Sequence, residues 1–193
     1  MKDKLNQAFY WIRKYKTIFI SMLISAITII IAINVFNYYS EAKIYNHVAK
    51  QTDELSQNII RAYHTKPNYW GLSTEDVINR KIYPSGMKEA NGQLLGFLKK
   101  PVEIGADDSG TAVMPTSKNF VIAHNELSKK QCVGFGGHAF NEKFWLKVEK
   151  ITIKNEDISQ DFMWGDREYG LPIDKEILKN ICRSNNNSVV IHF

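Results

Sequence analysis

The stretch IFISMLISAITIIIAINV, from Ile18 to Val35, decides the architecture of this chain. It holds no charged side chain, and about 20 such residues in an α-helix span a hydrocarbon core of about 30 Å. We therefore expect a transmembrane helix over residues 18–36. Function must then be sought in a domain that is tethered to a membrane.

The flanks of this stretch predict its orientation. Residues 1–17 form a basic segment with five cations and one acid: Lys2, Lys4, Arg13, Lys14 and Lys16, against Asp3. The positive-inside rule keeps such a segment in the cytoplasm and exports the rest of the chain. A cleaved signal peptide is the alternative, but it would have a shorter apolar core followed by small residues. Here the bulky residues Phe36, Tyr38 and Tyr39 follow, as in an interfacial aromatic belt.

The helical pattern continues beyond the apolar stretch. Over residues 37–66, apolar or small residues recur in steps of three and four, at Tyr45, Val48, Thr52, Leu55, Ile59 and Ala62. This spacing predicts one narrow packing stripe along a helix. No proline interrupts residues 17–66, so we expect one long continuous helix that Pro67 stops. Its own domain would bury part of the stripe, and neighbouring subunits could pack on the rest.

Residues 67–193 are expected to form one globular domain of short helices and strands. Ser73 followed by Asp76 predicts the start of a helix that ends near Arg80. Further elements are expected as a brief helix over 127–131, a glycine-rich turn over 134–137, a helix over 173–181, and strands over 101–104, 119–124, 144–153 and 188–193. The fold class is α+β, with an antiparallel sheet packed on the outer half of the long helix.

Charge and motifs exclude several classes of function. The formal charge of +5 is concentrated at residues 1–16, which carry +4, so the outer domain is nearly neutral. It shows no basic stripe of the kind that binds nucleic acid. The histidines do not recur at metal-ligand spacing, and no nucleophile–base motif is present. We expect no catalytic residues, no metal site and no cofactor.

The two cysteines, Cys132 and Cys182, lie in the exported domain. Two cysteines on one exported domain usually pair, and closing a loop of about 50 residues stabilises a fold by about 4 kcal/mol. Two buried free thiols are the alternative.

The order of these segments resembles a known family. The residues that carry the resemblance are Leu55–Tyr63, Tyr69–Thr74, Tyr83–Met87, Pro101–Ile104, Phe120–Ile122, Leu127–Cys132 and Cys182 with Asn187–Phe193. Together they are similar to type IV pilins, and specifically to the type IVb and conjugative-plasmid (PilS-like) branch. The resemblance implies a pilin head in which residues 132–182 form a disulfide-bounded loop.

The N-terminus departs from the pilin pattern. Prepilins carry a Gly before their cleavage point and a Glu five residues into the mature chain. Here no Gly precedes the apolar run, and if Phe19 were the first residue of the mature chain, position five would be Leu23. We therefore expect an uncleaved, membrane-retained accessory protein more than a major fibre subunit.

The expected function is a non-enzymatic, pilin-like structural or assembly protein of a type IV pilus or a related conjugation or secretion system. It would lie in the bacterial inner membrane with its head in the periplasm. Its partners would be other pilin subunits or pilus assembly proteins, together with the membrane, and no nucleic acid. The alternative is a tethered binding or adhesion module that recognises a ligand through the loop between Cys132 and Cys182.

Overall fold

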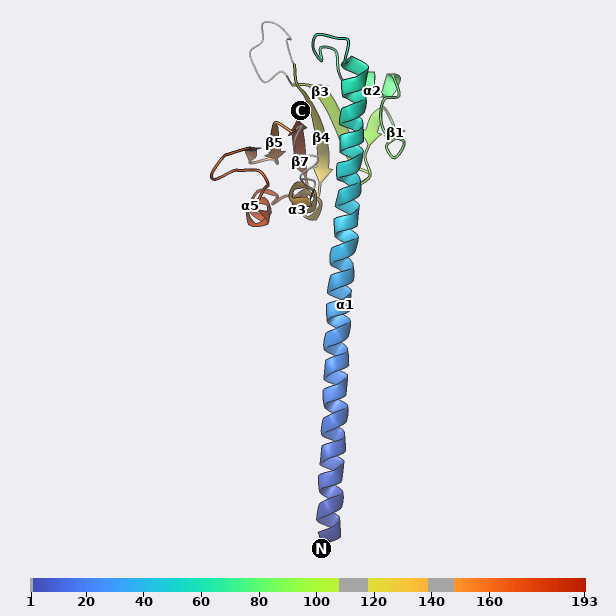
Figure 1. The fold of residues 1–193 in the computed structure, drawn as a ribbon, viewed down its shortest axis with the longest axis vertical. Coiled ribbons are helices and arrows are strands. Elements are labelled where there is room, and N and C mark those ends of the chain that lie inside the picture. Colours follow the sequence, from blue (N-terminus) through green and yellow to red (C-terminus); the bar gives the residue numbers. More distant parts are fainter. Residues whose placement is uncertain (1, 108–117, 139–147) are drawn as a thin grey trace. The chain divides into compact units, whose positions relative to one another are not determined.

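The structure, a computed structural model, describes residues 2–107, 118–138 and 148–193, and its fold is α+β, as expected (Figure 1). The chain divides into two compact units, Met1–Glu41 and Ala42–Phe193. We refer to the second unit as the head. The long N-terminal helix is α1, Lys2–Tyr63, which contributes residues to both units.

The first unit consists of helix throughout its described residues. Its apolar side chains lie on the surface; Ile24 and Ile30, for example, are each 58% exposed. The hydroxyls of Ser21, Ser25 and Thr28 donate to backbone carbonyls three or four residues earlier. Such internal pairing is what a helix in lipid requires, because lipid offers no hydrogen-bond partner. By length and composition, one helix in the described part of the chain could cross a membrane.

The head is built on an antiparallel sheet. In the described residues the strands are β1 (Lys88–Ala90), β2 (Gln93–Leu95), β3 (Pro101–Ala106), β4 (Phe120–Leu127), β5 (Lys150–Lys154), β6 (Ser159–Met163) and β7 (Asn187–His192). Their order in the sheet is β1-β2-β3-β4-β7-β5-β6. Strand β7 therefore lies between β4 and β5, and it pairs antiparallel with both.

Within the described residues, three short helices accompany the sheet: α2 (Thr74–Asn79), α3 (Lys129–His138) and α5 (Lys175–Ile181). Helix α2 begins as the sequence predicts, because the Ser73 side chain accepts a hydrogen bond from the backbone N–H of Asp76. The Asp76 carboxylate in turn accepts from the Tyr63 hydroxyl at 2.8 Å, which ties α2 to the end of α1. Burial, and then this contact, raise the pKa of Tyr63 to about 12.

The described part of the head contains two apolar core clusters, and α1 contributes to both. Tyr45 and Val48 belong to the first cluster, with side chains from α3, α5, β5 and β7. Leu55 and Ile59 belong to the second, with side chains from α2, β2, β3 and β4. Both Leu55 and Ile59 are fully buried, and burying one such side chain stabilises a fold by about 1.5–3 kcal/mol. The sheet therefore packs on the head's part of α1.

One stretch of the sequence was wrongly predicted. The brief helix expected over residues 127–131 is present from Lys129, as the start of α3, while β4 extends to Leu127. The turn expected over residues 134–137 is not found, because α3 runs through all three of these glycines, at 134, 136 and 137. The cause is close packing. A Cβ at Gly134 would lie 2.2 Å from the Tyr45 ring, and one at Gly136 would lie 3.1 Å from Leu178. Because these glycines carry no side chain, α3 can stay helical and still pack closely against its neighbours.

The strand expected over residues 144–153 appears in part. Strand β5 covers Lys150–Lys154, and residues 144–147 lie outside the described part of the chain. The last strand, expected over 188–193, is β7.

Candidate assembly site: the helix face and the disulfide

The six residues of the predicted packing stripe lie on the side of α1 that the head covers. Five are buried and the sixth is partly buried: Tyr45, Val48, Thr52, Leu55 and Ile59, then Ala62. All the apolar members contact one of the two clusters of the head. The chain's own sheet thus occupies this stripe, and a neighbouring molecule would have to contact other faces of the helix.

Polar contacts accompany this apolar face. The Tyr45 hydroxyl donates to the backbone carbonyl of Lys130 at 3.2 Å. The Gln51 side-chain oxygen accepts from the backbone N–H of Phe97 at 2.8 Å. Because these pairs join fixed atoms, they define one register between helix and head, as single buried polar residues do in coiled coils. The spacing of apolar residues along the helix could not identify Gln51 as buried, because its side chain is polar.

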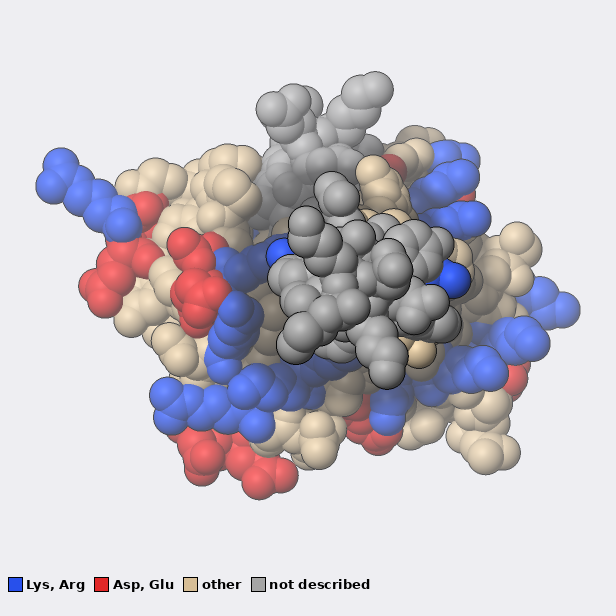
Figure 2. Space-filling model, turned by 90° about the horizontal axis from the view of Figure 1, so that it is seen from below, with Lys and Arg blue, Asp and Glu red and all other residues tan. Residues whose placement is uncertain are grey.

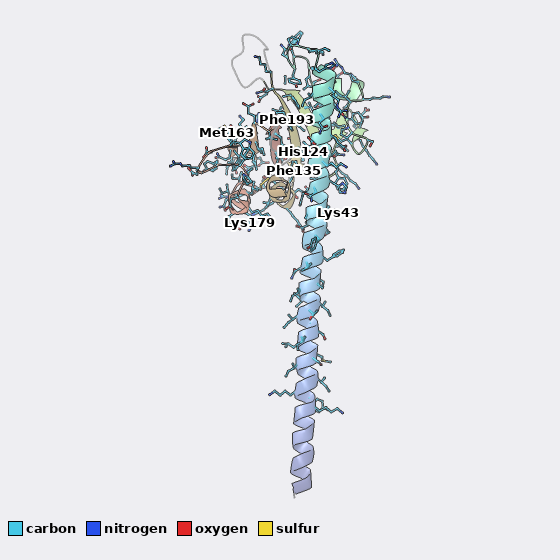
Figure 3. All side chains as sticks on the ribbon, in the orientation of Figure 1. Lys43, His124, Phe135, Met163, Lys179 and Phe193 are labelled. Carbon is cyan, nitrogen blue, oxygen red and sulfur yellow. A yellow bond between two sulfur atoms is a disulfide. The ribbon has the colours of Figure 1, made fainter. Side chains whose placement is uncertain are left out.

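His124 is a further polar partner of α1, and it faces the helix from strand β4 (Figure 3). Its Nε2 atom lies 2.9 Å from the Thr52 hydroxyl, which already donates its proton to the carbonyl of Val48. When the hydroxyl donates to this carbonyl, its oxygen accepts from a proton on Nε2. His124 is 3% exposed, its ring meets Phe135 edge-on, and burial lowers its pKa to about 4.

Burial of neutral His124 predicts a pH-dependent stability. An unfolded histidine has a pKa of about 6.5. Above that pH the imidazole is neutral in both the folded and the unfolded state, and the free energy of unfolding keeps its full value. As the pH falls from about 6.5 to about 4, the unfolded state takes up a proton that the folded state refuses, and about 3 kcal/mol is lost. Urea unfolding of the wild-type chain at several pH values should show this loss of stability. In the His124→Leu variant, the pH dependence over this range should be absent. Equal pH dependence in both proteins would contradict the assignment.

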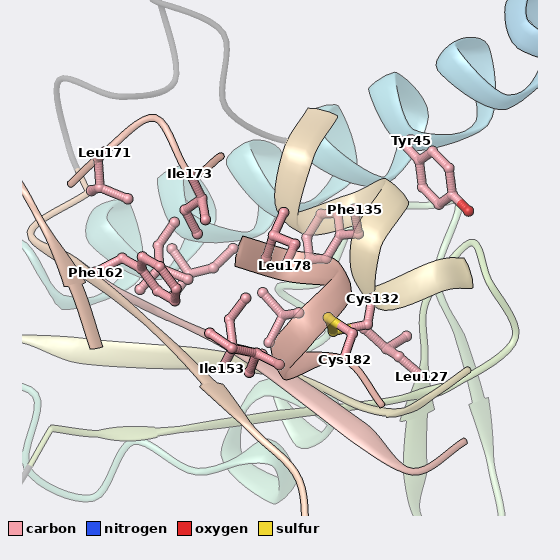
Figure 4. Close-up of a cluster of buried hydrophobic side chains, with 14 of the residues drawn as sticks. Tyr45, Leu127, Cys132, Phe135, Ile153, Phe162, Leu171, Ile173, Leu178 and Cys182 are labelled. Carbon is pink, nitrogen blue, oxygen red and sulfur yellow. A yellow bond between two sulfur atoms is a disulfide. The ribbon is translucent and has the colours of Figure 1, made fainter. Parts of the chain in front are cut away.

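The cysteines are joined, which decides between the two alternatives. Cys132 in α3 and Cys182 at the end of α5 have an S–S distance of 2.06 Å and a Cα–Cα distance of 5.9 Å. Both are fully buried in the first cluster, between Leu127 and Leu178 (Figure 4). The disulfide thus links the two helices that cover one half of the sheet.

A second polar group lies on the other face of the sheet, and the sequence reading missed it. The side chains of Asp107, His192, Thr152, Asp161 and Lys150 form a chain of contacts of 2.6 to 3.1 Å. The alternation of β5 and β7 places Thr152 and His192 on one face of the sheet as diagonal neighbours, so the sequence carried a signal for this contact. Burial acts to raise the pKa of Asp161, but hydrogen bonds from Thr152 and Lys150 outweigh it and hold the pKa below its usual value.

This arrangement of Asp107, His192 and Thr152 has the order of a carboxylate–imidazole–hydroxyl triad, but its protons lie in the wrong places. In such a triad the imidazole takes the hydroxyl proton. Here the Thr152 hydroxyl donates its proton to the Asp161 carboxylate at 2.7 Å, so its oxygen accepts from His192. The geometry fits a structural ladder across β5, β6 and β7. In the described residues, no group of three or more His, Cys, Asp or Glu side chains could hold a metal ion.

The fold that these elements make is that of type IV pilins, which confirms the resemblance at the level of fold. The chain is similar to the crystal structure of a type IVb pilin from Salmonella typhi, with 17% identity, a TM-score of 0.51, and coverage of 79% of this chain and 96% of that one. It is also similar to TcpA, a type IV pilin from the Vibrio cholerae El Tor biotype. There the identity is 10%, the TM-score 0.52, and the coverage 78% of this chain and 99% of that one. No family model and no curated protein sequence matches the chain. The conjugative branch stays a prediction.

Proposed function

We propose that the chain is a non-enzymatic, pilin-like structural or assembly protein of a type IV pilus or a related conjugation or secretion system. One observation carries the proposal. Helix α1 combines an apolar half with the length of a membrane span and a second half whose buried face holds a disulfide-closed antiparallel sheet. The likeness of the fold to two type IV pilins supports it.

The proposed topology follows the charges of the N-terminus. Residues 1–17 would lie in the cytoplasm, residues 18–36 in the inner membrane, and residues 37–193 in the periplasm, with 67–193 as the globular part. An oxidising periplasm is consistent with a disulfide between Cys132 and Cys182.

The proposed partners are other pilin subunits or pilus assembly proteins. Since the head covers the buried stripe of α1, contacts between subunits would use the apolar surface of residues 18–35. On the head's part of the helix, Ile44 and Ile60 are exposed apolar side chains, at 39% and 38%, and they are further candidates for such contacts.

The topology predicts the outcome of proteolysis and mass measurement in a Gram-negative host. Protease added to spheroplasts should digest the head and leave a protected N-terminal fragment. The intact mass should equal the full chain less two hydrogens, with or without a co-expressed prepilin peptidase. A protected head would contradict the orientation. Loss of about the first 18 residues only with the peptidase would instead indicate a processed, fibre-forming pilin.

The assembly role has its own test. A photo-crosslinking amino acid at Ile44, in a host that carries a type IV pilus system, should give adducts with a second copy or with a pilus protein. The same amino acid at exposed Asn79 in α2 serves as the control and should give none. Equal adduct formation at both positions would contradict assembly through α1.

A membrane-tethered binding module is the second candidate. Its support is a pair of exposed side chains within the loop from Cys132 to Cys182: Met163 is 47% exposed and Trp164 is 49% exposed. Exposed aromatic side chains on a rigid scaffold often contact ligands. A chain that binds a ligand through this loop and forms no adduct with other pilins would favour this function.

A further inference from the structure

Charge is unevenly distributed over the head. Removing the five cations and two acids of residues 1–41 from the chain's totals of 25 and 20 leaves the head 20 cations and 18 acids, a net charge of +2. A domain so close to neutral can still present faces of opposite sign, and it is the local density of charge that determines what a face attracts.

Five segments meet at one end of the head, as the strand register shows. Lys100 precedes β3 and forms an ion pair with Glu126 near the end of β4, at 3.9 Å. Leu127 pairs with Asn187 at the start of β7, and Ser188 pairs with Lys154 at the end of β5. The Tyr45 hydroxyl brings the first turns of the head's part of α1 to the start of α3. The disulfide adds the end of α5.

This end is basic, and we refer to it as the basic end. Its residues are 42–46, 96–100, 126–131, 154–158 and 174–187, and it carries nine cations: Lys43, Lys99, Lys100, Lys129, Lys130, Lys154, Lys175, Lys179 and Arg183. It carries five acids, Glu126, Glu156, Asp157, Asp174 and Glu176, for a net charge of +4. The remainder of the head then carries −2. Lysine and arginine side chains spread over this face in Figure 2, and Figure 3 labels Lys43 and Lys179 upon it.

Most of these cations are exposed, and only Lys100 is partly buried. Two of the acids are engaged by cations of the same end, since Glu126 pairs with Lys100 and Glu176 with Lys179. The cations come from separate segments of the chain. A dispersed array of ammonium groups suits an extended sheet of phosphates, which attracts each nearby lysine or arginine.

We propose that the basic end docks on the anionic phospholipid head groups of the bilayer that holds the apolar helix. The proposal rests on the membrane anchoring proposed above. Lys43 follows Phe36 by seven residues, which is about 10 Å of helix. That distance is close to the Debye length of about 8 Å at physiological salt, so the first cations of the head lie within reach of the charge of the lipid surface.

The full chain, reconstituted in vesicles and checked by flotation, allows a lysine footprint to test the proposal. An amine-acylating reagent followed by mass spectrometry reports the reactivity of each lysine. In vesicles with roughly one third phosphatidylglycerol, Lys99, Lys129 and Lys179 should react about fivefold more slowly than in pure phosphatidylcholine. Lys66, Lys81 and Lys88, which are exposed and lie outside the basic end, should react equally in both. Salt at about 0.5 M should abolish the difference.

Charge-reversed variants sharpen the test. Lys99→Glu with Lys129→Glu should remove the protection of Lys179, whereas the control pair Lys81→Glu with Lys88→Glu should keep it. The pairs are matched, because Lys99 and Lys81 have φ values of 56° and 55° and all four residues are exposed.

A chain that floats with the vesicles but shows no lipid-dependent protection would overturn this proposal and leave anchoring intact. A chain that does not float would contradict the anchoring itself. If these lysines are instead protected in pure phosphatidylcholine, and more so when each vesicle holds more chains, a second copy of the chain covers the basic end. That result would also overturn docking on lipid.

Discussion

A chain with alanine in place of both Cys132 and Cys182 should lose about 4 kcal/mol of stability in its head. The disulfide closes a loop with a sequence separation of 50, and a cross-link of that span removes much conformational freedom from the unfolded chain. Single domains are stable by only about 5–15 kcal/mol, so the loss leaves the head close to unfolding at physiological temperature.

Urea unfolding of the full chain in detergent, followed by tryptophan fluorescence, measures this effect. Reduced wild-type chain is the matched control, because it keeps both sulfur atoms in the core and loses only the covalent bond. We expect the reduced chain to reproduce most of the loss. If the double variant is much less stable than the reduced chain, packing of the buried sulfurs, and not the cross-link, supplies the stability.

Replacement of Gly134 by valine should destabilise the head by about 3 kcal/mol or more, since overpacking of a core commonly costs 1–3 kcal/mol. Even the Cβ atom would lie 2.2 Å from two carbon atoms of the Tyr45 ring, well inside van der Waals contact. That ring is 5% exposed and its hydroxyl is bonded to the carbonyl of Lys130, so it has no free space into which to move.

Gly137→Ala is the matched control for Gly134→Val. It changes the same helix three residues later, where the added carbon meets the flexible side chain of Lys175 at 3.3 Å. Alanine there should be neutral or slightly stabilising, since glycine in a helix costs up to about 1 kcal/mol. A second variant, Gly134→Val with Tyr45→Ala, should recover part of the loss. If the two changes prove additive, contact between these side chains is not the cause.

The long helix and the α+β class could be predicted because their signals are local. An uninterrupted apolar stretch and a stripe with steps of three and four need no knowledge of distant residues. The hairpin of β1 and β2 also had a local signal, which was missed. Asn91 and Gly92 have φ values of 52° and 75°, as an Asn-Gly turn between paired strands requires.

The glycines of α3 show where local reasoning fails. A glycine-rich segment indicates a turn when it is read alone, and only the position of Tyr45, nearly ninety residues earlier in the chain, explains why it is helical. The buried polar contacts between α1 and the rest of the head could not be predicted for the same reason. Gln51 and His124 are buried because each meets a particular atom across the core, and no periodicity encodes that atom.

The position of β7 in the sheet has a consequence for how the chain is made. Among the described strands, β1–β4 share no ladder with the pair β5–β6, and β7 is the one that pairs with both groups. Until residues 187–192 leave the ribosome, two strand edges in the centre of the sheet stay open, and open edges invite pairing with other chains. If the head crosses the membrane as proposed, from residue 37 toward residue 193, closure of the head is therefore a late event. Translocation as an unfolded polypeptide, protected from aggregation until synthesis is complete, is the route that this order of strands favours.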